Sequence, residues 1–411
     1  MFYSYEFFLR VSPSVMVPEL MESFHVDAAG LGIMASAYYW AYVAMQIPAG
    51  LLVVRFGPKK LLVTAIILVV IGSFIFAGIG DVYFATFSRI LIGLGSAFAF
   101  VCSLKLITEW FPPYRFALMA GLTQFLGYMG ASAGGEPLSY LVDHVGWRDA
   151  VFTAAMLGVV LVVLVWLIVR DSPRGLAQRF KMTHGFQVLR GLREVMRNPQ
   201  SWFNGLYACC MMGPTSVFAA LWGVPYLVHV NGIQHGVAAG AVSVIFFGVA
   251  IGSPMFGWFS DQIRLRRLPL MIAALGAMLV TTAILYWSSV PIWALYILCF
   301  FFGFFQSAHV LNFAIAHEIN RPAANGAAIG FTNMLTVVGG ALFLPVVGIF
   351  LQYGWTGQKL NGVAEYSVAD YHWSLVLLPT VQLLAFIIAT VLLKETRCKP
   401  QYEQRAKRGR A

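Results

Sequence analysis

The feature that most constrains this chain is a series of apolar runs that recurs from one end to the other. About 20 apolar residues in an α-helix cross roughly 30 Å of hydrocarbon, and "LLVTAIILVVIGSFIFAGIG" at residues 61–80 is typical of these runs. Hydrophobic residues make up 59% of the chain and charged residues 11%, more apolar surface than one soluble core can bury. The pattern predicts an all-α membrane protein, because unalternated runs of this length exclude a β-barrel.

The runs predict twelve membrane-spanning helices. Their expected ranges are 2–21, 29–53, 61–80, 83–107, 116–141, 150–169, 203–228, 237–259, 268–287, 291–316, 325–352 and 372–393. With both termini in the cytoplasm, the helices hold Arg10, Arg89 and Lys105, and the outer side holds only Arg148 and Lys359. All other Lys and Arg then lie on the cytoplasmic side, as the positive-inside rule requires. We therefore expect the net charge of +10 to set the membrane topology, with no nucleic acid as partner.

Two matches at nearly the same offset indicate an internal repeat. "GLLVVRFGPKK" (residues 50–60) corresponds to "GWFSDQIRLRR" (residues 257–267), and "PYRFALMAGLTQFL" (residues 113–126) corresponds to "PAANGAAIGFTNML" (residues 322–335). A repeat of this kind is typical of transporters built from duplicated bundles. We expect a six-helix bundle at 1–169, a basic cytoplasmic linker at 170–201, a second six-helix bundle at 202–393 and a basic tail at 394–411.

These motifs resemble the major facilitator superfamily over essentially the whole chain. Besides the loop at residues 50–60, "RILIGLGSA" (residues 89–97) and "GWRDAVF" (residues 146–152) are similar to motifs of that family. "YEFFLRVSPSVMVPEL" and "LKLITEWFPPYRFALMAGL" resemble a bacterial branch that includes phagosomal transporters of amino acids and nucleosides, with lysosomal dipeptide facilitators as more distant relatives. The resemblance implies alternating access, a bacterial inner-membrane location and function as a monomer.

The resemblance also implies a gating motif at the cytoplasmic loops. In the family an Asp of this motif caps a neighbouring helix and pairs with the cations of the loop, which steadies the outward-facing state. Asp261 keeps that Asp, whereas Val54 replaces it in the first half. The alternative is that the cations only anchor the topology. The expected gating residues are Gly50, Arg55, Gly57, Lys59, Lys60, Gly257, Asp261, Arg264, Arg266 and Arg267.

Motifs for other activities are absent from the sequence. It contains no phosphate-binding loop, zinc-protease motif, nucleophile elbow or dinucleotide fingerprint. The five cysteines show no C-x-x-C spacing, so we expect neither a disulfide nor a zinc site. We predict that the protein is not an enzyme, uses no cofactor or metal, and moves a small molecule with a gradient as the driving force.

Ionisable residues inside spans are functional candidates because hydrocarbon makes them costly. Glu6 and Arg10 are four residues apart on one helical face. They could bind the amine and the carboxylate of a zwitterion, or they could only neutralise each other. Arg89 could take part in proton coupling or pack against a neighbouring helix. Glu136 could carry a proton if buried, or face water. The proton-coupling candidates are therefore Glu6, Arg89 and Glu136.

Polar and aromatic residues in the other spans are expected to line a central cavity. His309 could relay protons, although a hydrogen-bonded packing role is favoured. Tyrosines and amides suit nucleosides as well as amino acids or peptides, so residue chemistry alone leaves the substrate open. The expected substrate-binding residues are Glu6, Arg10, Tyr39, Tyr42, Gln46, Gln124, Tyr128, Tyr207, Gln306, His309, Asn312 and Asn333.

Small residues mark where helices approach closely. Gly130 and Gly134 in one helix, and Gly248 and Gly252 in another, have the four-residue spacing of close helix contacts. We expect them at the seam between the bundles, with static packing as the alternative.

The sequence thus predicts a secondary transporter that works by alternating access. An amino acid or dipeptide is the favoured substrate and proton symport the favoured coupling. The alternatives are a nucleoside or organic-anion importer, with sugar acids and siderophores as possible anions, a drug or metabolite exporter, and a non-transporting membrane sensor or scaffold.

Overall fold

The computed structural model describes residues 1–112, 115–171, 185–287, 289–360 and 363–401, with residues 54, 116–118, 185–189, 359–360 and 363 described by their backbone alone. The first half contains α1 (Phe2–Val11), η1 (Ser12–Val15), α2 (Val17–Phe24), α3 (Ala28–Phe56), α4 (Pro58–Gly78), α5 (Val82–Trp110), α6 (Phe116–Ala133), α7 (Glu136–Val145) and α8 (Trp147–Ile168). The linker contributes helix α9 (Gly185–Met196).

The second half repeats this organisation. It contains α10 (Pro199–Val217), η3 (Phe218–Trp222), α11 (Gly223–Asn231), α12 (His235–Ile263), α13 (Arg267–Tyr286), α14 (Ile292–Gln306), η4 (Ser307–Val310), α15 (Leu311–Ile319), η5 (Pro322–Ala324), α16 (Asn325–Gly354), α17 (Val368–Leu375), α18 (Leu377–Ile387) and η6 (Ile388–Leu392). A short antiparallel hairpin, β1 (Lys359–Leu360) and β2 (Val363–Ala364), precedes α17.

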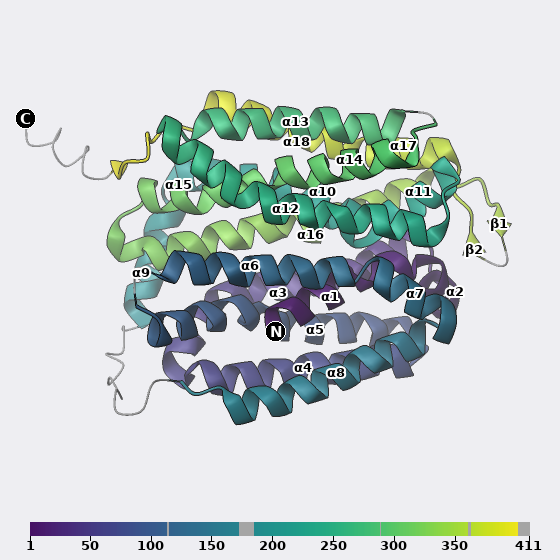
Figure 1. The fold of residues 1–411 in the computed structure, drawn as a ribbon, viewed down its shortest axis with the longest axis horizontal. Coiled ribbons are helices and arrows are strands. Elements are labelled where there is room, and N and C mark those ends of the chain that lie inside the picture. The colour runs from purple at the N-terminus through teal and green to yellow at the C-terminus, as the bar shows by residue number, and fades with distance from the viewer. Residues whose placement is uncertain (113–114, 172–184, 288, 361–362, 402–411) are drawn as a thin grey trace, which may run out of the picture.

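Apart from the linker helix α9 and the hairpin, the described elements join end to end into twelve helical segments, which lie side by side along the long axis (Figure 1). In the described part of the chain, nine are long and apolar enough to cross a membrane. The first and fifth segments are interrupted, at Ser12–Val15 and at Gly134–Gly135, and the tyrosines and Gln46 of α3 lower its hydropathy. The expected fold class, two six-helix bundles in the membrane, is confirmed.

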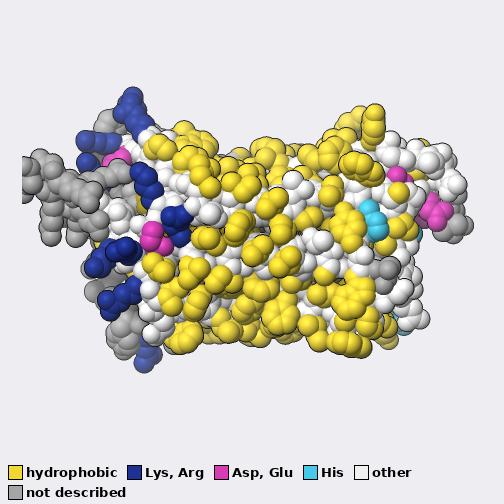
Figure 2. All heavy atoms as spheres, turned by 90° about the horizontal axis from the view of Figure 1, so that it is seen from above, with side chains coloured by type: hydrophobic (Ala, Val, Ile, Leu, Met, Phe, Trp, Pro, Cys, Tyr) yellow, Lys and Arg dark blue, Asp and Glu magenta, His cyan; other side chains and the backbone are white. Residues whose placement is uncertain are grey.

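The two ends of the molecule differ in charge (Figure 2). Apolar side chains form a belt around the middle, and Lys and Arg gather at one end. We call this the basic end; it holds the loops that contain Lys59, Arg266 and Arg321. The opposite end carries β1 and β2 (Figure 1), and we call it the hairpin end. An apolar belt between two polar ends is the surface that a lipid bilayer requires.

Two seams join the bundles. Helix α3 of the first half packs along α16 of the second half, and α6 packs against α12. Because α3 starts at the hairpin end and α16 starts at the basic end, each seam runs through the full depth of the molecule. Opening or closing either end therefore changes contacts along these same helices.

Candidate functional site

The break in the first helix positions two arginines. Pro13 has no N–H, so the carbonyl of Leu9 cannot accept the usual helical hydrogen bond from residue 13. Ser12 Oγ and Arg89 Nη1 donate to this carbonyl instead, each at 3.1 Å. Arg89 is buried, and its guanidinium lies 5.1 Å from the centre of the Tyr38 ring. Arg89 therefore holds the C-terminal end of α1, next to Arg10.

A buried ion pair forms the centre of the site. Arg10 pairs with Glu6 Oε1, and Tyr38 completes a triangle: its hydroxyl donates to Glu6 Oε1 at 2.6 Å and accepts from Arg10 Nε at 3.2 Å. The guanidinium also lies 4.4 Å from the ring centre of Phe7 and 5.0 Å from that of Tyr42, a favourable cation–π arrangement. Glu6 is fully buried and Glu6 Oε2 has no partner within the described residues.

Arg10 faces a cavity between the bundles. The cavity volume is ≈ 20 Å³, which is about the space of one water. In this state the cavity is closed and has room for no larger molecule. Its lining comes from both halves: Phe7, Arg10, Val11, Tyr39, Tyr128, Met212, Thr215, Ser216, Ala220, Phe246, Val249, Gln306 and His309. Among the described residues of that lining, Arg10 is the only arginine, lysine or carboxylate, and His309 is the only other ionisable group besides the tyrosines. Glu6 lies behind Arg10 and does not reach the cavity surface.

Several polar atoms in the cavity wall lack hydrogen bonds. Thr215 Oγ1 and both amide atoms of Gln306 are buried and have no partner among the residues that the structure describes, and the Tyr39 hydroxyl, which faces Ser216, makes no hydrogen bond of ordinary geometry within them. His309 Nδ1, by contrast, lies 2.9 Å from the carbonyl of Gln306. Buried polar groups are nearly always hydrogen-bonded. The unpartnered atoms around this cavity therefore require either water or polar groups of a ligand as their partners.

At the hairpin end the bundles are in close contact. A Cβ on Gly32 would lie 2.8 Å from the carbonyl oxygen of Leu344 across the α3–α16 seam. Tyr366, in the loop after β2, accepts from the Ala28 backbone N–H at 3.0 Å and donates to Gln352 at 2.9 Å. Burial raises the pKa of Tyr366 to about 12, so the phenol stays neutral and keeps both bonds at ordinary pH. This end is sealed.

At the basic end the same seam is parted. Cβ atoms on Gly50, Gly326 and Gly330 would have no atom of another segment within 4 Å. A vestibule of ≈ 300 Å³ lies here between α3, α9 and α16. Gln46 lines it and accepts a hydrogen bond of 2.6 Å from Asn333 Nδ2 across the seam. This bond joins the two bundles beside the vestibule.

The structure brings together only part of the expected substrate site. Arg10, Tyr39, Tyr128, Gln306 and His309 line the cavity, with Tyr42 in contact with Arg10. The other expected residues do not line the cavity, which corrects their assignment. Glu6 lies behind Arg10. Gln46 and Asn333 pair with each other beside the vestibule.

Three side chains are engaged within their own bundle. The Tyr207 hydroxyl donates to the Leu270 carbonyl at 2.8 Å, Asn312 donates to the Asn204 carbonyl at 2.7 Å, and Gln124 accepts from Tyr3. Glu136 is exposed at the start of α7, whereas a proton carrier of the expected kind needs a buried carboxyl. Polarity within a span therefore did not indicate which face of its helix a residue occupies.

The four glycines assigned to the seam also lie elsewhere. Cβ atoms on Gly130 and Gly134 would meet the backbone of α1, at the carbonyls of Ser4 and Phe8. Those on Gly248 and Gly252 would meet the backbone of α14, at the carbonyls of Phe300 and Phe304. All four contacts are within one bundle, so these glycines serve static packing. At the α6–α12 seam the close contact is instead between Gly135 and Ser243.

The gating motif is held together by carboxylates that follow the last helix of each half. Asp171 accepts from the Lys59 backbone N–H at 2.7 Å, and Glu395 accepts from those of Arg266 and Arg267, both at 2.9 Å. Each carboxylate thus caps the start of a helix, α4 or α13. "RDS" at residues 170–172 and "KET" at residues 394–396 are the matching sequence features, and the repeat analysis missed them.

The two copies of the motif differ in their ion pairs. Arg266 bonds to Asp261 and to Glu318, both at 2.8 Å. Burial disfavours the charge of Arg266, but Glu318 and Asp261 outweigh it and raise the guanidinium pKa. In the first copy Arg55 lies over the Phe56 ring at 5.2 Å, and the side chain of Val54 falls outside the description.

The remaining motif residues hold turns and helix ends. Gly57 has φ +81, which favours glycine. Arg264 takes a similar left-handed turn, Arg267 Nε donates to the Ala389 carbonyl, Lys60 is exposed, and a Cβ on Gly257 would meet no other segment.

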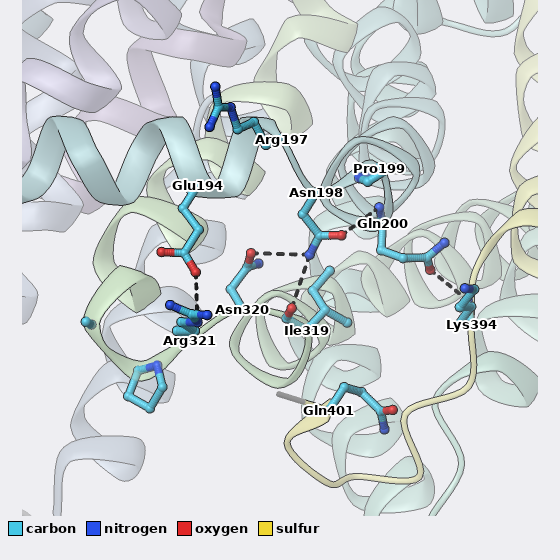
Figure 3. A pocket seen from close by; sticks show the side chains of 12 residues that line it. Glu194, Arg197, Asn198, Pro199, Gln200, Ile319, Asn320, Arg321, Lys394 and Gln401 are labelled. Carbon is cyan, nitrogen blue, oxygen red and sulfur yellow. Dashed lines mark hydrogen bonds and ion pairs between the residues drawn. The ribbon is translucent and has the colours of Figure 1, made fainter. Parts of the chain in front are cut away.

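A larger hollow of ≈ 1010 Å³ lies at the basic end (Figure 3). Arg321 pairs with Glu194 of α9 at 3.3 Å, Asn198 donates to the Ile319 carbonyl at 3.1 Å, and Gln200 accepts from the Lys394 backbone at 2.9 Å. These groups bond to one another and tie the linker to the second bundle. Unlike Gln306 and Thr215 in the central cavity wall, these polar groups have partners among the described residues.

Three polar side chains of the site were missing from the sequence expectation. Tyr38, which bonds both Glu6 and Arg10, stands one turn before Tyr42 and could have been found by that spacing. Thr215 and Ser216 follow Pro214 inside α10. Hydroxyl residues are common in spans, so no sequence signal separated these two from the others.

Comparisons with known proteins define the class. The model of the Major Facilitator Superfamily matches residues 3–230 and 210–410. The chain therefore belongs to the Major Facilitator Superfamily and is a membrane transporter, as the motif resemblance implied. The narrower resemblance to phagosomal transporters stays a prediction.

Individual relatives are distant. The chain is 23% identical to a probable sulfoacetate transporter of Cupriavidus necator, over 84% of this chain and 83% of that protein. It is 24% identical to a probable galactarate/D-glucarate transporter of Escherichia coli, over 87% and 86%. A stretch of 160 residues is 31% identical to an uncharacterized transporter of Bacillus subtilis, covering 39% of this chain and 37% of that one.

Among solved structures, the fold matches a bacterial homologue of the human lysosomal transporter Spinster, determined in an inward-facing, unoccupied conformation. The TM-score is 0.75 with 15% identity, over 95% of this chain and 93% of the other.

Proposed function

We propose that this transporter moves a small organic anion and that Arg10 binds the anionic group. The observation that carries the proposal is the position of the Glu6–Arg10 pair: Arg10 lines the cavity and Glu6 does not. A guanidinium can hold a carboxylate or sulfonate with two parallel hydrogen bonds. The sulfoacetate and galactarate/D-glucarate transporters, whose names specify organic anions, support the same class.

The amino acid or dipeptide favoured by the sequence is not confirmed, and the geometry argues against it. A bound amine needs an anionic partner, and no described carboxylate lines the cavity. Glu6 is fully buried behind Arg10, with Tyr38 on the same oxygen. Glu6 therefore serves as the counter-ion of Arg10, which keeps the cation tolerable in a dry site when no substrate is bound.

For coupling, we propose proton symport with Glu6 as the proton site. Its second oxygen has no described partner, and protonation of Glu6 would leave Arg10 free to attract an anion. Proton binding and anion binding at this pair would thus favour each other. Arg89 acts indirectly, because its described contacts are the Leu9 carbonyl and the Tyr38 ring.

For topology, we propose that the basic end faces the cytoplasm, by the positive-inside rule, with bundles at 1–169 and 202–393 as expected from the repeat. The closed α3–α16 seam at the hairpin end and the parted seam at the basic end then correspond to a state whose vestibule opens toward the cytoplasm while the central cavity is closed. We further propose that it works as a monomer in a bacterial inner membrane.

A thermal-shift comparison tests the anion site. Carboxylates without an amine should raise the melting temperature of the wild type, because they bind only the folded state. Arg10→Gln should reduce their affinity at least about tenfold, equivalent to roughly 1.4 kcal/mol. Glu6→Gln discriminates between substrate classes: it should keep or strengthen binding of an amine-free carboxylate, whereas a zwitterion site would lose its amine partner. Equal binding by Arg10→Gln and wild type would contradict the proposal.

A further inference from the structure

The central cavity has one charged corner and a neutral polar wall. Arg10 supplies the charge from the first bundle. Gln306 of α14 and Thr215 of α10 supply polar groups from the second bundle, and Tyr39 of α3 adds a hydroxyl. Phe7, Val11, Met212, Phe246 and Val249 complete the lining with apolar surface.

The unpartnered atoms on this wall include both donors and acceptors. Gln306 offers an amide oxygen that accepts and an amide nitrogen that donates, and the hydroxyls of Tyr39 and Thr215 can do either. An ammonium group can only donate and a carboxylate can only accept. A hydroxyl does both, so substrate hydroxyls satisfy this wall most fully.

A second carboxylate on the substrate would meet no second arginine or lysine among the described residues that line the cavity. Arg89 is the other buried arginine nearby, but it lies against Tyr38 and the Leu9 carbonyl and is absent from the cavity lining. His309 lines the cavity, and its Nδ1 is engaged by the Gln306 carbonyl. Burying a charge against neutral amide and hydroxyl groups is costly.

On the basis of the proposed anion transport, we infer that the substrate is a hydroxylated monocarboxylate. Arg10 binds its carboxylate, Gln306, Thr215 and Tyr39 bind its hydroxyls, and the apolar residues pack against its C–H face. The arrangement selects against diacids and against carboxylates without hydroxyls. The cavity must widen to admit such a molecule, and the vestibule beside Gln46 lies on the parted side of the seam.

Three six-carbon probes separate these requirements in a binding competition on the purified full-length protein. Gluconate has one carboxylate and hydroxyls, hexanoate has one carboxylate and no hydroxyl, and glucarate has two carboxylates. Gluconate should bind at least about tenfold more tightly than either of the others, a difference of roughly 1.4 kcal/mol.

Gln306→Leu should weaken gluconate about tenfold and leave hexanoate unchanged. Thr215→Val, which keeps the side-chain shape, should weaken gluconate severalfold and serves if Gln306→Leu does not fold. Gln382→Leu is the matched control: Gln382 is also fully buried with both amide atoms unpartnered, but it lies in α18 outside the cavity lining. That variant should bind gluconate as the wild type does.

The outcomes distinguish this inference from the proposed function. Binding of glucarate as tight as gluconate, or equal binding of hexanoate, overturns the hydroxylated monocarboxylate while Arg10-dependent anion binding stands. Failure of every carboxylate tested to bind, or binding that Arg10→Gln leaves unchanged, overturns the anion site and the inference with it.

Discussion

At the scale of single residues, Pro13 and Tyr38 decide what the charged pair can do. Pro13 frees the Leu9 carbonyl for Arg89, and Tyr38 occupies the Glu6 oxygen that also holds Arg10. The spacing of Glu6 and Arg10 predicted the pair from the sequence. The burial of Glu6 could not be predicted, because it depends on how α3 is rotated against α1, and rotation is set by packing between helices.

A double-mutant cycle tests Glu6 as the counter-ion of Arg10. Glu6→Gln leaves a buried guanidinium without its ion pair, which costs about 3–5 kcal/mol in such settings, so the melting temperature should fall by several degrees. Combining Glu6→Gln with Arg10→Gln removes both charges and should restore much of the loss. Melting temperatures of the four proteins without ligand give the coupling. Additive losses would show that the two side chains act independently.

At the scale of helices, glycine spacing identified close contacts but not their partners. Gly134 and Gly252 are tightly packed, as their spacing indicated, yet against α1 and α14 of their own bundles. A small-residue face packs equally well against any helix that presents backbone to it. The sequence therefore predicted which helices have such faces, while the assignment to the seam required the three-dimensional arrangement.

Leucine substitutions at two glycines separate packing from gating. Gly134→Leu places a side chain against Val11 and the Phe8 carbonyl and should destabilise the first bundle by about 1–3 kcal/mol or more. A Cβ at Gly330 would have no atom of another segment within 4 Å in this state, and Gly330 borders the vestibule, so Gly330→Leu should fold and bind normally. It should nevertheless slow transport, because closing the basic end would bring α3 and α16 together there. Melting temperature and exchange rate are the two measurements; a stable Gly134→Leu or a fully active Gly330→Leu would contradict this assignment.

At the scale of the whole molecule, the internal repeat and the charge distribution were sufficient to predict the architecture of two six-helix bundles. Apolar runs gave the segments, and the matches at residues 50–60 and 257–267 gave the duplication, because both depend on local sequence. The difference between the sealed hairpin end and the parted basic end was not predictable. It depends on contacts such as Ala28 with Tyr366, which are far apart in the sequence.

The central claim is that Arg10 binds an organic anion that the protein carries across the membrane. Exchange in proteoliposomes tests it without any assumption about coupling, since unlabelled substrate inside drives entry of labelled substrate. With gluconate inside and radiolabelled gluconate outside, the wild type should accumulate label and Arg10→Gln should fall to the level of empty liposomes, with Gln382→Leu as active control. If gluconate does not bind, the amine-free carboxylate that gives the largest thermal shift replaces it. Wild-type exchange by Arg10→Gln would contradict the account.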